Sequence, residues 1–316
     1  MEKENIVYIK FLQIILINML IYSYSVASKD FQRHYTYIAK NYDVASVIRG
    51  DKQEKNKQLG NKDLILDFDF VKTTKIQNDS FVLIIGINEY KENTNVEYAD
   101  FSALAFKELA NKSLGIPNEN IITLLNDDAT SGQLKSKIEL IKELSDKNGN
   151  LYVYFAGHGV PGKDGNTYLL PYDMTADSIH LEPNLQLDKI YANLSNSEAK
   201  NVFVFMDSCF SGKDDTGDLL YKGVAPVLKT KKTLITNSKL TIFTAGKSTD
   251  FANDFQDKKQ RLFSYYLIKE LSKGKTNLNN IYSTVKNKVK RASLRKGIGY
   301  KQVPQLYGDK NKTLIW

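Results

Sequence analysis

Five mostly apolar runs, each stopping abruptly at a polar loop, constrain the fold of this chain more than any other feature. They are FVLIIGI (81–87), NIITLL (120–125), NLYVYFA (150–156), NVFVFMD (201–207) and LTIFTA (240–245). An apolar run of this kind is typical of a strand that is buried on both faces, because a half-exposed strand would alternate with polar residues. The runs therefore predict the inner strands of a covered sheet.

Segments with the apolar spacing of helices separate these runs. They cover residues 99–113, 130–146, 187–195, 260–272 and 277–294. Strands that alternate with helices are joined by right-handed crossovers and form a mostly parallel sheet with helices on both faces. The last residues, 303–316, are expected to add a further strand. The predicted fold class is α/β, a sandwich around a mostly parallel sheet of about six strands.

The N-terminus has a different composition. Lys3 and Lys10 precede an almost wholly apolar run at 11–24, and a Ser-Val-Ala triplet follows at 25–27. This is the pattern of a secretory signal peptide. Residues 1–27 are therefore predicted to be removed and the protein to be exported, to the periplasm or outside the cell, with no stable membrane anchor. The alternative is a retained anchor, which the shortness of the run disfavours.

Residues 28–78 are polar and weakly periodic, and we predict an N-terminal extension or pro-segment that precedes a domain at 79–316. The chain carries 44 basic and 36 acidic residues, a formal net charge of +8. The basic residues are scattered, without a stripe that alternates with stacking aromatic residues, so nucleic acid is not an expected partner. A solvated basic surface accounts for the charge.

One histidine and one cysteine stand at comparable places. The strand predicted at 150–156 runs into a loop that contains His158, and the strand predicted at 201–207 runs into a loop that contains Cys209. In open parallel sheets, ligands bind at the carboxyl ends of strands, so neighbouring strands would bring these two residues together. Cys209 is also the only cysteine. A lone thiol in an exported protein cannot form an internal disulfide, which favours a chemical use.

The two side chains suit nucleophilic catalysis. A thiol with an ordinary pKa of about 8.5 is mostly protonated at neutral pH, and a nearby imidazole can take its proton and later protonate a leaving amine. We expect His158 and Cys209 to form a catalytic dyad, with the backbone N–H groups of Gly159 and Cys209 as an oxyanion hole. Either side chain alone would be interpreted as structural, since histidines often brace loops and lone cysteines are usually buried.

Several motifs resemble those of the caspase-like cysteine peptidases, peptidase family C14, and are most similar to its metacaspase and bacterial caspase-domain branch. They are FVLIIGINEY at 81–90, YAD at 98–100, YFAGHG at 154–159, LLPYD at 169–173, FMDSCFSG at 205–212, IFTAG at 242–246, RLFSYYLIKEL at 261–271 and QVPQLYG at 302–308. The resemblance implies a caspase-like α/β/α sandwich with a six-stranded sheet. It also implies that His158 is the general base and Cys209 the nucleophile, and their separation suits the family.

The same resemblance implies a division of the domain. A large-subunit-like part would span 79–224, a linker 225–239 and a small-subunit-like part 240–316. The linker contains three lysines, so an enzyme that prefers basic residues could cleave itself there. The alternative is an uncut basic loop.

Asp207 marks a departure from caspases, in which Gln-Ala precedes the nucleophilic cysteine and two arginines help to bind a P1 aspartate. The metacaspase-like Asp207 implies an acidic S1 pocket that favours Arg or Lys at P1, and Asp100 of the YAD motif is a second S1 candidate. A carboxylate pairs well with a guanidinium and repels a P1 aspartate. The alternatives are a loop-bracing role for Asp207 and an N-cap role for Asp100.

No cofactor is expected to be required, but calcium is a candidate activator. Many metacaspases need calcium, and three acidic residues after the cysteine loop offer hard oxygen ligands, namely Asp214, Asp215 and Asp218. The alternative is that these acids are simply solvated.

The sequence thus predicts an exported cysteine endopeptidase that hydrolyses protein or peptide substrates after Arg or Lys. Two alternatives stay open. One is a binding or scaffold protein on the same fold with little turnover, and the other is an amidase or transpeptidase that uses the same dyad. The sequence indicates neither the natural substrate nor the oligomeric state.

Overall fold

The computed structural model describes residues 68–210, 212, 218, 220, 238–247 and 250–314. The predicted signal peptide at 1–27, most of the predicted extension at 28–78 and most of the predicted linker at 225–239 lie outside these residues. The calcium candidates Asp214 and Asp215 also lie outside them.

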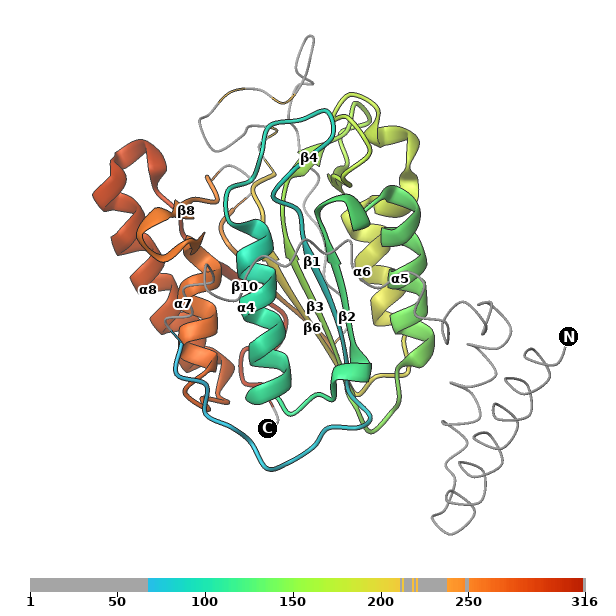
Figure 1. The fold of residues 1–316 in the computed structure, drawn as a ribbon, viewed down its shortest axis with the longest axis vertical. Coiled ribbons are helices and arrows are strands. Elements are labelled where there is room, and N and C mark those ends of the chain that lie inside the picture. Colours follow the sequence, from blue (N-terminus) through green and yellow to red (C-terminus); the bar gives the residue numbers. More distant parts are fainter. Residues whose placement is uncertain are drawn as a thin grey trace, which may run out of the picture. The chain divides into compact units, whose positions relative to one another are not determined.

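Within the described residues, six strands form the central sheet (Figure 1). In chain order they are β1 (Phe81–Gly86), β2 (Ile121–Leu125), β3 (Asn150–Ala156), β6 (Asn201–Asp207), β7 (Leu240–Thr244) and β10 (Gln305–Tyr307). Their order across the sheet is β10-β7-β6-β3-β1-β2, and every neighbouring pair is parallel except β10 with β7. The predicted α/β class and the mostly parallel six-stranded sheet are confirmed.

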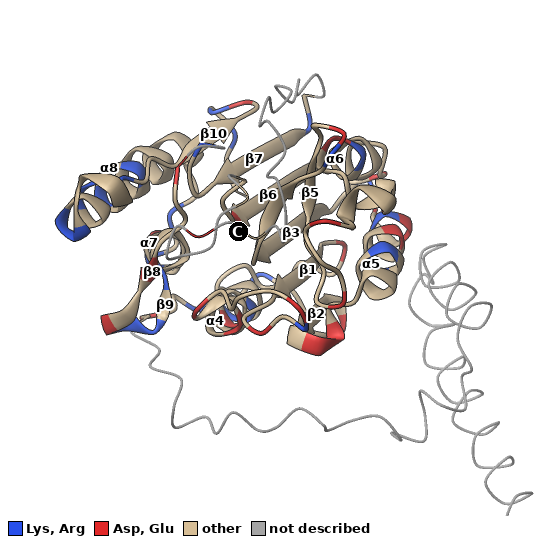
Figure 2. Ribbon diagram, turned by 90° about the horizontal axis from the view of Figure 1, so that it is seen from above, with Lys and Arg blue, Asp and Glu red and all other residues tan. Residues whose placement is uncertain are grey.

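Five α-helices of the described part cover the sheet. They are α4 (Ala99–Lys112), α5 (Ser131–Leu144), α6 (Leu187–Ser195), α7 (Leu262–Leu271) and α8 (Leu278–Lys296). Figures 1 and 2 show α5 and α6 on one face and α4, α7 and α8 on the other. Among the helices that the structure describes, none has the length and apolar character needed to cross a lipid bilayer.

Short elements join the main ones. β4 (Gly159–Pro161) pairs with β5 (Thr167–Leu169), and β8 (Asp254–Phe255) pairs with β9 (Gln260–Arg261). The 3₁₀ turns are η1 (Asn118–Asn120), η2 (Asn126–Asp128), η3 (Ile179–Leu181), η4 (Pro183–Leu185), η5 (Gln256–Lys258) and η6 (Ile298–Tyr300). Residues 260 and 261, expected to open a helix, form β9 instead, because they pair with β8 before α7 begins.

The place of each strand in the sheet explains its composition and direction. β1 and β3 have neighbours on both sides and helices on both faces, and all their residues are buried. β2 is an edge strand and is only partly buried. β10 is antiparallel because two helices, α7 and α8, follow β7. The second helix brings the chain back to the carboxyl end of β7, from which β10 runs in the opposite direction.

The helix starts differ in how they are capped. Thr130 Oγ1 accepts a hydrogen bond from the Gln133 N–H at 3.3 Å at the start of α5, an ordinary N-cap. At the start of α4, Tyr98 is the N-cap in a left-handed conformation with φ 64°, and its side chain makes no capping bond. The Asn88 side chain holds this turn by accepting from the Tyr98 N–H at 2.9 Å. Asp100 therefore lies inside the first turn of α4.

Candidate active site

The loops that carry His158 and Cys209 begin at the carboxyl ends of two adjacent strands. β3 and β6 are parallel neighbours, and Ala156 lies opposite Asp207 at their last register position. His158 and Cys209 each follow two residues later. A hydrogen bond from the Gly157 N–H to the Asp207 carbonyl, at 3.3 Å, continues the pairing beyond the strands. The register therefore starts both loops side by side.

His158 is buried, and its ring has two defined neighbours. Nε2 lies 2.9 Å from the Thr94 carbonyl oxygen, and the His158 backbone N–H donates to Tyr90 Oη at 2.7 Å. The Tyr90 ring is tilted against the imidazole, with 4.9 Å between centroids. Because a carbonyl oxygen only accepts, Nε2 carries the proton in the neutral tautomer, and Nδ1 carries the lone pair that a base needs.

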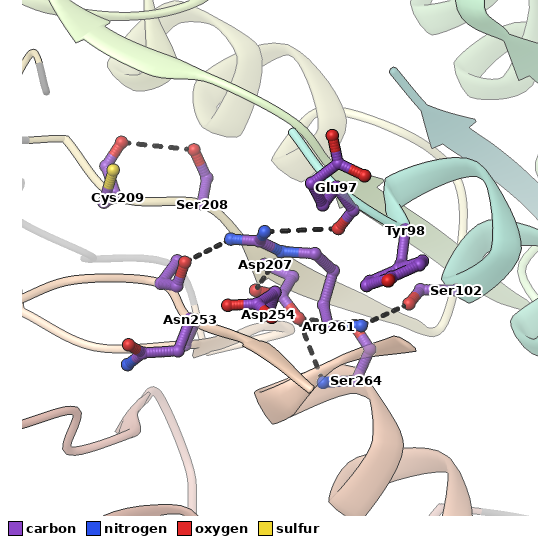
Figure 3. Close-up of polar contacts among 12 residues, drawn as sticks. Glu97, Tyr98, Ser102, Asp207, Ser208, Cys209, Asn253, Asp254, Arg261 and Ser264 are labelled. Carbon is purple, nitrogen blue, oxygen red and sulfur yellow. Dashed lines mark hydrogen bonds and ion pairs between the residues drawn. The ribbon is translucent and has the colours of Figure 1, made fainter. Parts of the chain in front are cut away.

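Cys209 lies in the loop that follows β6. It is 7% exposed, and it forms no disulfide. Ser208 Oγ lies 3.3 Å from the Cys209 carbonyl oxygen, to which it donates a hydrogen bond (Figure 3). The thiol is thus part of a loop that is largely covered by protein.

Two glycines let the histidine loop pass close to its surroundings. A Cβ on Gly157, which has φ 158°, would fall 2.6 Å from Tyr90 Oη. A Cβ on Gly159 would collide with the Phe210 ring and fall 2.6 Å from Ser208 Oγ. A side chain at either position would force these neighbours apart. Gly157 therefore permits the close approach of Tyr90, and Gly159 permits the contact with the cysteine loop.

The hairpin of β4 and β5 orients the Gly159 backbone. Gly159 lies opposite Leu169, and the Leu170 N–H donates to the His158 carbonyl at 3.0 Å. This is the pattern of a non-hydrogen-bonded pair, in which the N–H of the central residue points away from the partner strand. The Gly159 N–H therefore points out of the hairpin, as an oxyanion donor would have to do.

Asp207 is fully buried at the end of β6, and its carboxylate faces the start of α7 (Figure 3). Oδ2 accepts hydrogen bonds from the Ser264 N–H at 3.0 Å and from the Ser264 hydroxyl at 2.6 Å. Because Ser264 lies in the first turn of α7, the carboxylate also meets the positive end of the helix dipole. The Tyr154 hydroxyl lies 2.6 Å from Ser264 Oγ. Burial, together with the nearby Asp207 charge, raises the pKa of Tyr154.

Arg261 lies beside the same carboxylate and is 1% exposed. Its Nε is 3.9 Å from Asp207 Oδ1. Its terminal nitrogens donate to the carbonyl of Glu97, at 3.3 Å, and to the carbonyl of Ala252. Its backbone N–H donates to Ser102 Oγ at 2.8 Å (Figure 3). Arg261 thus joins the start of α7 to the start of α4 and to the end of β6.

Asp100, the second S1 candidate, is buried where α4 begins, above the end of β1. Its Oδ1 accepts from the Phe101 N–H at 2.8 Å, and Asn126 Nδ2 donates to Oδ2 at 3.4 Å. Burial raises the pKa of Asp100, and these hydrogen bonds only partly oppose the effect. β1 and β6 are the two neighbours of β3, so Asp100 and Asp207 flank the histidine strand, but their hydrogen-bond partners are separate.

The metal candidates gain no structural partner set. Across residues 68–314, as far as the structure describes them, no three His, Cys, Asp or Glu side chains are grouped so that they could hold a metal ion. Asp218 is exposed, and the other two candidates, Asp214 and Asp215, lie outside the described residues.

Four residues of this site had no role in the sequence analysis. Thr94 contacts His158 through its backbone carbonyl, which every residue type supplies, so no sequence signal marks it. Tyr90, Arg261 and Ser264 stand inside the motifs quoted above. Their contacts are with residues far along the chain, which only the tertiary structure brings near them.

Comparison with known proteins relates this chain to one family. The model of the caspase domain, Peptidase_C14, matches residues 79–315. A structure of a Geobacter sulfurreducens protein is 18% identical, with 74% of this chain and 97% of that chain covered and a TM-score of 0.49. Caspase-1 from Spodoptera frugiperda is 15% identical, with 77% and 91% covered and a TM-score of 0.49.

No curated protein matches the chain. The family match nevertheless spans well over half of the sequence and includes both loops at the edge of the sheet. Its members are cysteine peptidases in general. On this match, the chain belongs to the caspase domain family, Peptidase_C14.

Proposed function

We propose that this protein is a cysteine endopeptidase that uses His158 and Cys209. The observation that carries the proposal is the register of β3 and β6, in which Ala156 lies opposite Asp207 and the two loops begin side by side. The hydrogen bond between His158 Nε2 and the Thr94 carbonyl, 2.9 Å long, supports it by leaving Nδ1 as the basic nitrogen.

In this proposal, Cys209 Sγ attacks the carbonyl carbon of the scissile peptide bond. His158 Nδ1 accepts the thiol proton and then delivers it to the leaving amine. The acyl group stays on Cys209 as a thioester, which water hydrolyses in a second step. The Gly159 and Cys209 N–H groups stabilise the oxyanion, and the outward direction of the Gly159 N–H supports this role. The Thr94 carbonyl stabilises the imidazolium that forms.

The specificity part of the proposal is cleavage after Arg or Lys. Asp207 stands at the end of β6, and Asp100, in the first turn of α4, lies above the end of β1. β6 and β1 flank β3, so a P1 cation bound near His158 would approach two carboxylates. Asp207 already lies beside Arg261, with 3.9 Å between Oδ1 and Nε. A P1 guanidinium would therefore have to share this carboxylate or replace its partner.

Three further parts of the proposal concern the setting of the enzyme. We propose export directed by residues 1–27, self-cleavage within 225–239, and calcium as an activator held by Asp214, Asp215 and Asp218. Each has its own measurement. N-terminal sequencing of the secreted protein tests export, mass spectrometry of the purified chain tests self-cleavage, and peptide hydrolysis with added calcium or chelator tests activation.

The test is hydrolysis of fluorogenic peptides that differ only in P1, carrying Arg, Lys, norleucine or Asp. The protein lacking residues 1–27 is compared with Cys209→Ala and His158→Ala, and with His180→Ala as a matched histidine control outside the site. We expect cleavage after Arg and Lys, a loss of at least about 10³-fold in both site variants, and no loss in the control.

The other outcomes separate the alternatives. Cleavage after Asp alone would keep the dyad but overturn the specificity. Joined rather than hydrolysed peptides would indicate a transpeptidase. Folded protein that cleaves nothing, with or without calcium, and whose Cys209 resists a thiol-directed probe would overturn the proposal in favour of a binding or scaffold role.

A further inference from the structure

We propose that Arg261 occupies the Asp207 carboxylate as an internal counter-ion and so limits the preference of this enzyme for a basic P1 residue. This inference rests on the proposed peptidase function and deepens it. It identifies the residue that sets the charge of the P1 subsite.

The contacts of Arg261 are those that a bound P1 arginine would need. Its guanidinium lies beside the Asp207 carboxylate and donates to the carbonyl of Glu97, as Figure 3 shows. It also donates to the carbonyl of Ala252. The side chains of Arg261 and Asp207 are 2% and 0% exposed. Asp207 stands only two residues before Cys209. The partners of a substrate guanidinium are therefore present near the nucleophile, and a side chain of the protein uses them.

The charge of the pair follows from this arrangement. A buried carboxylate and a buried guanidinium attract each other strongly, because little water screens them, and together they carry no net charge. A P1 cation that approaches meets a neutralised Asp207, whereas a free Asp207 would attract it. Asp100 is not part of this pair, since its carboxylate accepts from the Phe101 N–H and from the Asn126 side chain instead.

The position of Arg261 makes its removal a clean test. Arg261 is the N-cap of α7 and its backbone N–H bonds Ser102, so glycine at this position keeps both the helix start and this hydrogen bond. Arg261→Gly therefore removes the guanidinium and opens space beside Asp207. Arg261→Lys is the matched control that retains a cation. The double variant Asp207→Asn, Arg261→Gly removes both charges and leaves no charge unpaired.

The measurement is the ratio of kcat/KM for two peptides that differ only in P1, arginine or norleucine. We expect Arg261→Gly to raise this ratio at least about tenfold over the wild type, and Arg261→Lys to change it by less than about threefold. The double variant should return the ratio to within about threefold of the wild type. A ratio that is unchanged in Arg261→Gly, or raised equally in the double variant, would overturn the inference.

A second measurement does not depend on turnover. Arg261→Gly removes the cation beside a buried carboxylate, so the variant should unfold at a lower temperature than the wild type. Methylguanidinium at about 5 mM should raise the Tm of this variant by binding at Asp207, but not that of the wild type or the double variant. A variant that aggregates alone can be purified with methylguanidinium present. Absence of a Tm response in Arg261→Gly would contradict the inference.

The two measurements also distinguish the inference from the function on which it rests. A wild-type protein that neither cleaves peptides nor reacts with a thiol probe would overturn the peptidase function. A Tm response to methylguanidinium would in that case still show that Arg261 fills a guanidinium site at Asp207, while its absence would remove both.

Discussion

Two buried carboxylates lie at opposite ends of helix α7, one on a neighbouring strand and one on the helix itself, and they are neutralised in different ways. At the first turn, Asp207 accepts from Ser264 and lies beside the buried guanidinium of Arg261. At the last turn, the Glu270 carboxylate accepts hydrogen bonds from three ammonium groups, at 2.9, 2.5 and 2.6 Å. They belong to Lys273, Lys275 and Lys288 respectively. The side chains of these lysines are 40–44% exposed, whereas that of Arg261 is 2% exposed.

The helix dipole and access to water explain the difference. The start of a helix is partly positive and favours Asp207, while the end is partly negative and disfavours Glu270. Glu270 therefore needs more cations, and its lysines can return to water if the carboxylate is lost. Arg261 has no such route to water. The comparison teaches that the pair beside the cysteine loop is the costlier one to break.

The largest expected effect is the loss of stability when each of the two carboxylates is replaced by alanine. Asp207→Ala should lower the free energy of unfolding by about 3–5 kcal/mol, because it leaves Arg261 buried without its counter-ion. Glu270→Ala should cost only about 1–2 kcal/mol, because its lysines become solvated. Urea denaturation of both variants measures the difference, and equal losses would contradict this view of the two sites.

The pH dependence of stability should report on Glu270. Burial opposes ionisation of this carboxyl group, but hydrogen bonds from Lys275, Lys288 and Lys273 outweigh it and lower the pKa from 4.5 to about 2. Because the folded-state pKa is the lower one, the stabilisation is fully present above pH 4.5 and is lost as the pH falls toward about 2.

Glu270→Gln is the matched variant for this prediction. At neutral pH it should be less stable than the wild type by about 1–2 kcal/mol, and the difference should shrink steadily as pH falls below 4.5. Denaturant titrations at a series of pH values measure it. A difference that does not change with pH would show that the carboxylate charge contributes nothing.

Salt should distinguish the sites with a smaller effect. Raising the ionic strength from about 0.05 to about 1 M shortens the Debye length to about 3 Å and screens exposed lysines more than a buried guanidinium. The stability lost in Glu270→Ala should therefore fall by about half at high salt, while the loss in Asp207→Ala stays constant. Equal salt dependence in the two variants would argue against the contrast in exposure.

The smallest effect compares two lysines of the Glu270 site. Lys288 joins α8 to α7 and its Nζ lies 6.0 Å from the centre of the Tyr266 ring, whereas Lys273 bonds Glu270 across three residues. Lys288→Ala should cost about 1 kcal/mol and Lys273→Ala about 0.3 kcal/mol. Thermal unfolding of both variants checks the order, and a larger loss in Lys273→Ala would reverse it.

Most of the fold could be predicted from local patterns, because each pattern reports burial directly. The fully apolar β1 and β3 are inner strands, and the spacing of apolar residues in α5 and α6 matches the faces that they bury. Local spacing failed at residues 260 and 261, which pair with β8 instead of opening α7. The two strands of this hairpin are two residues each, which is too short to leave a periodic signal.

The sequence by itself determined the α/β class, the strand ends at which His158 and Cys209 stand, and the glycines beside the histidine. Their catalytic roles stay predictions. Only the tertiary structure decided that the Thr94 carbonyl orients His158 and that Asp207 already has a guanidinium beside it. Asp207 and Ser264 are 57 residues apart in the chain, and their contact exists only because α7 docks its first turn on the end of β6. The sequence identifies each charged residue, but the partner of that charge depends on which elements the fold packs together.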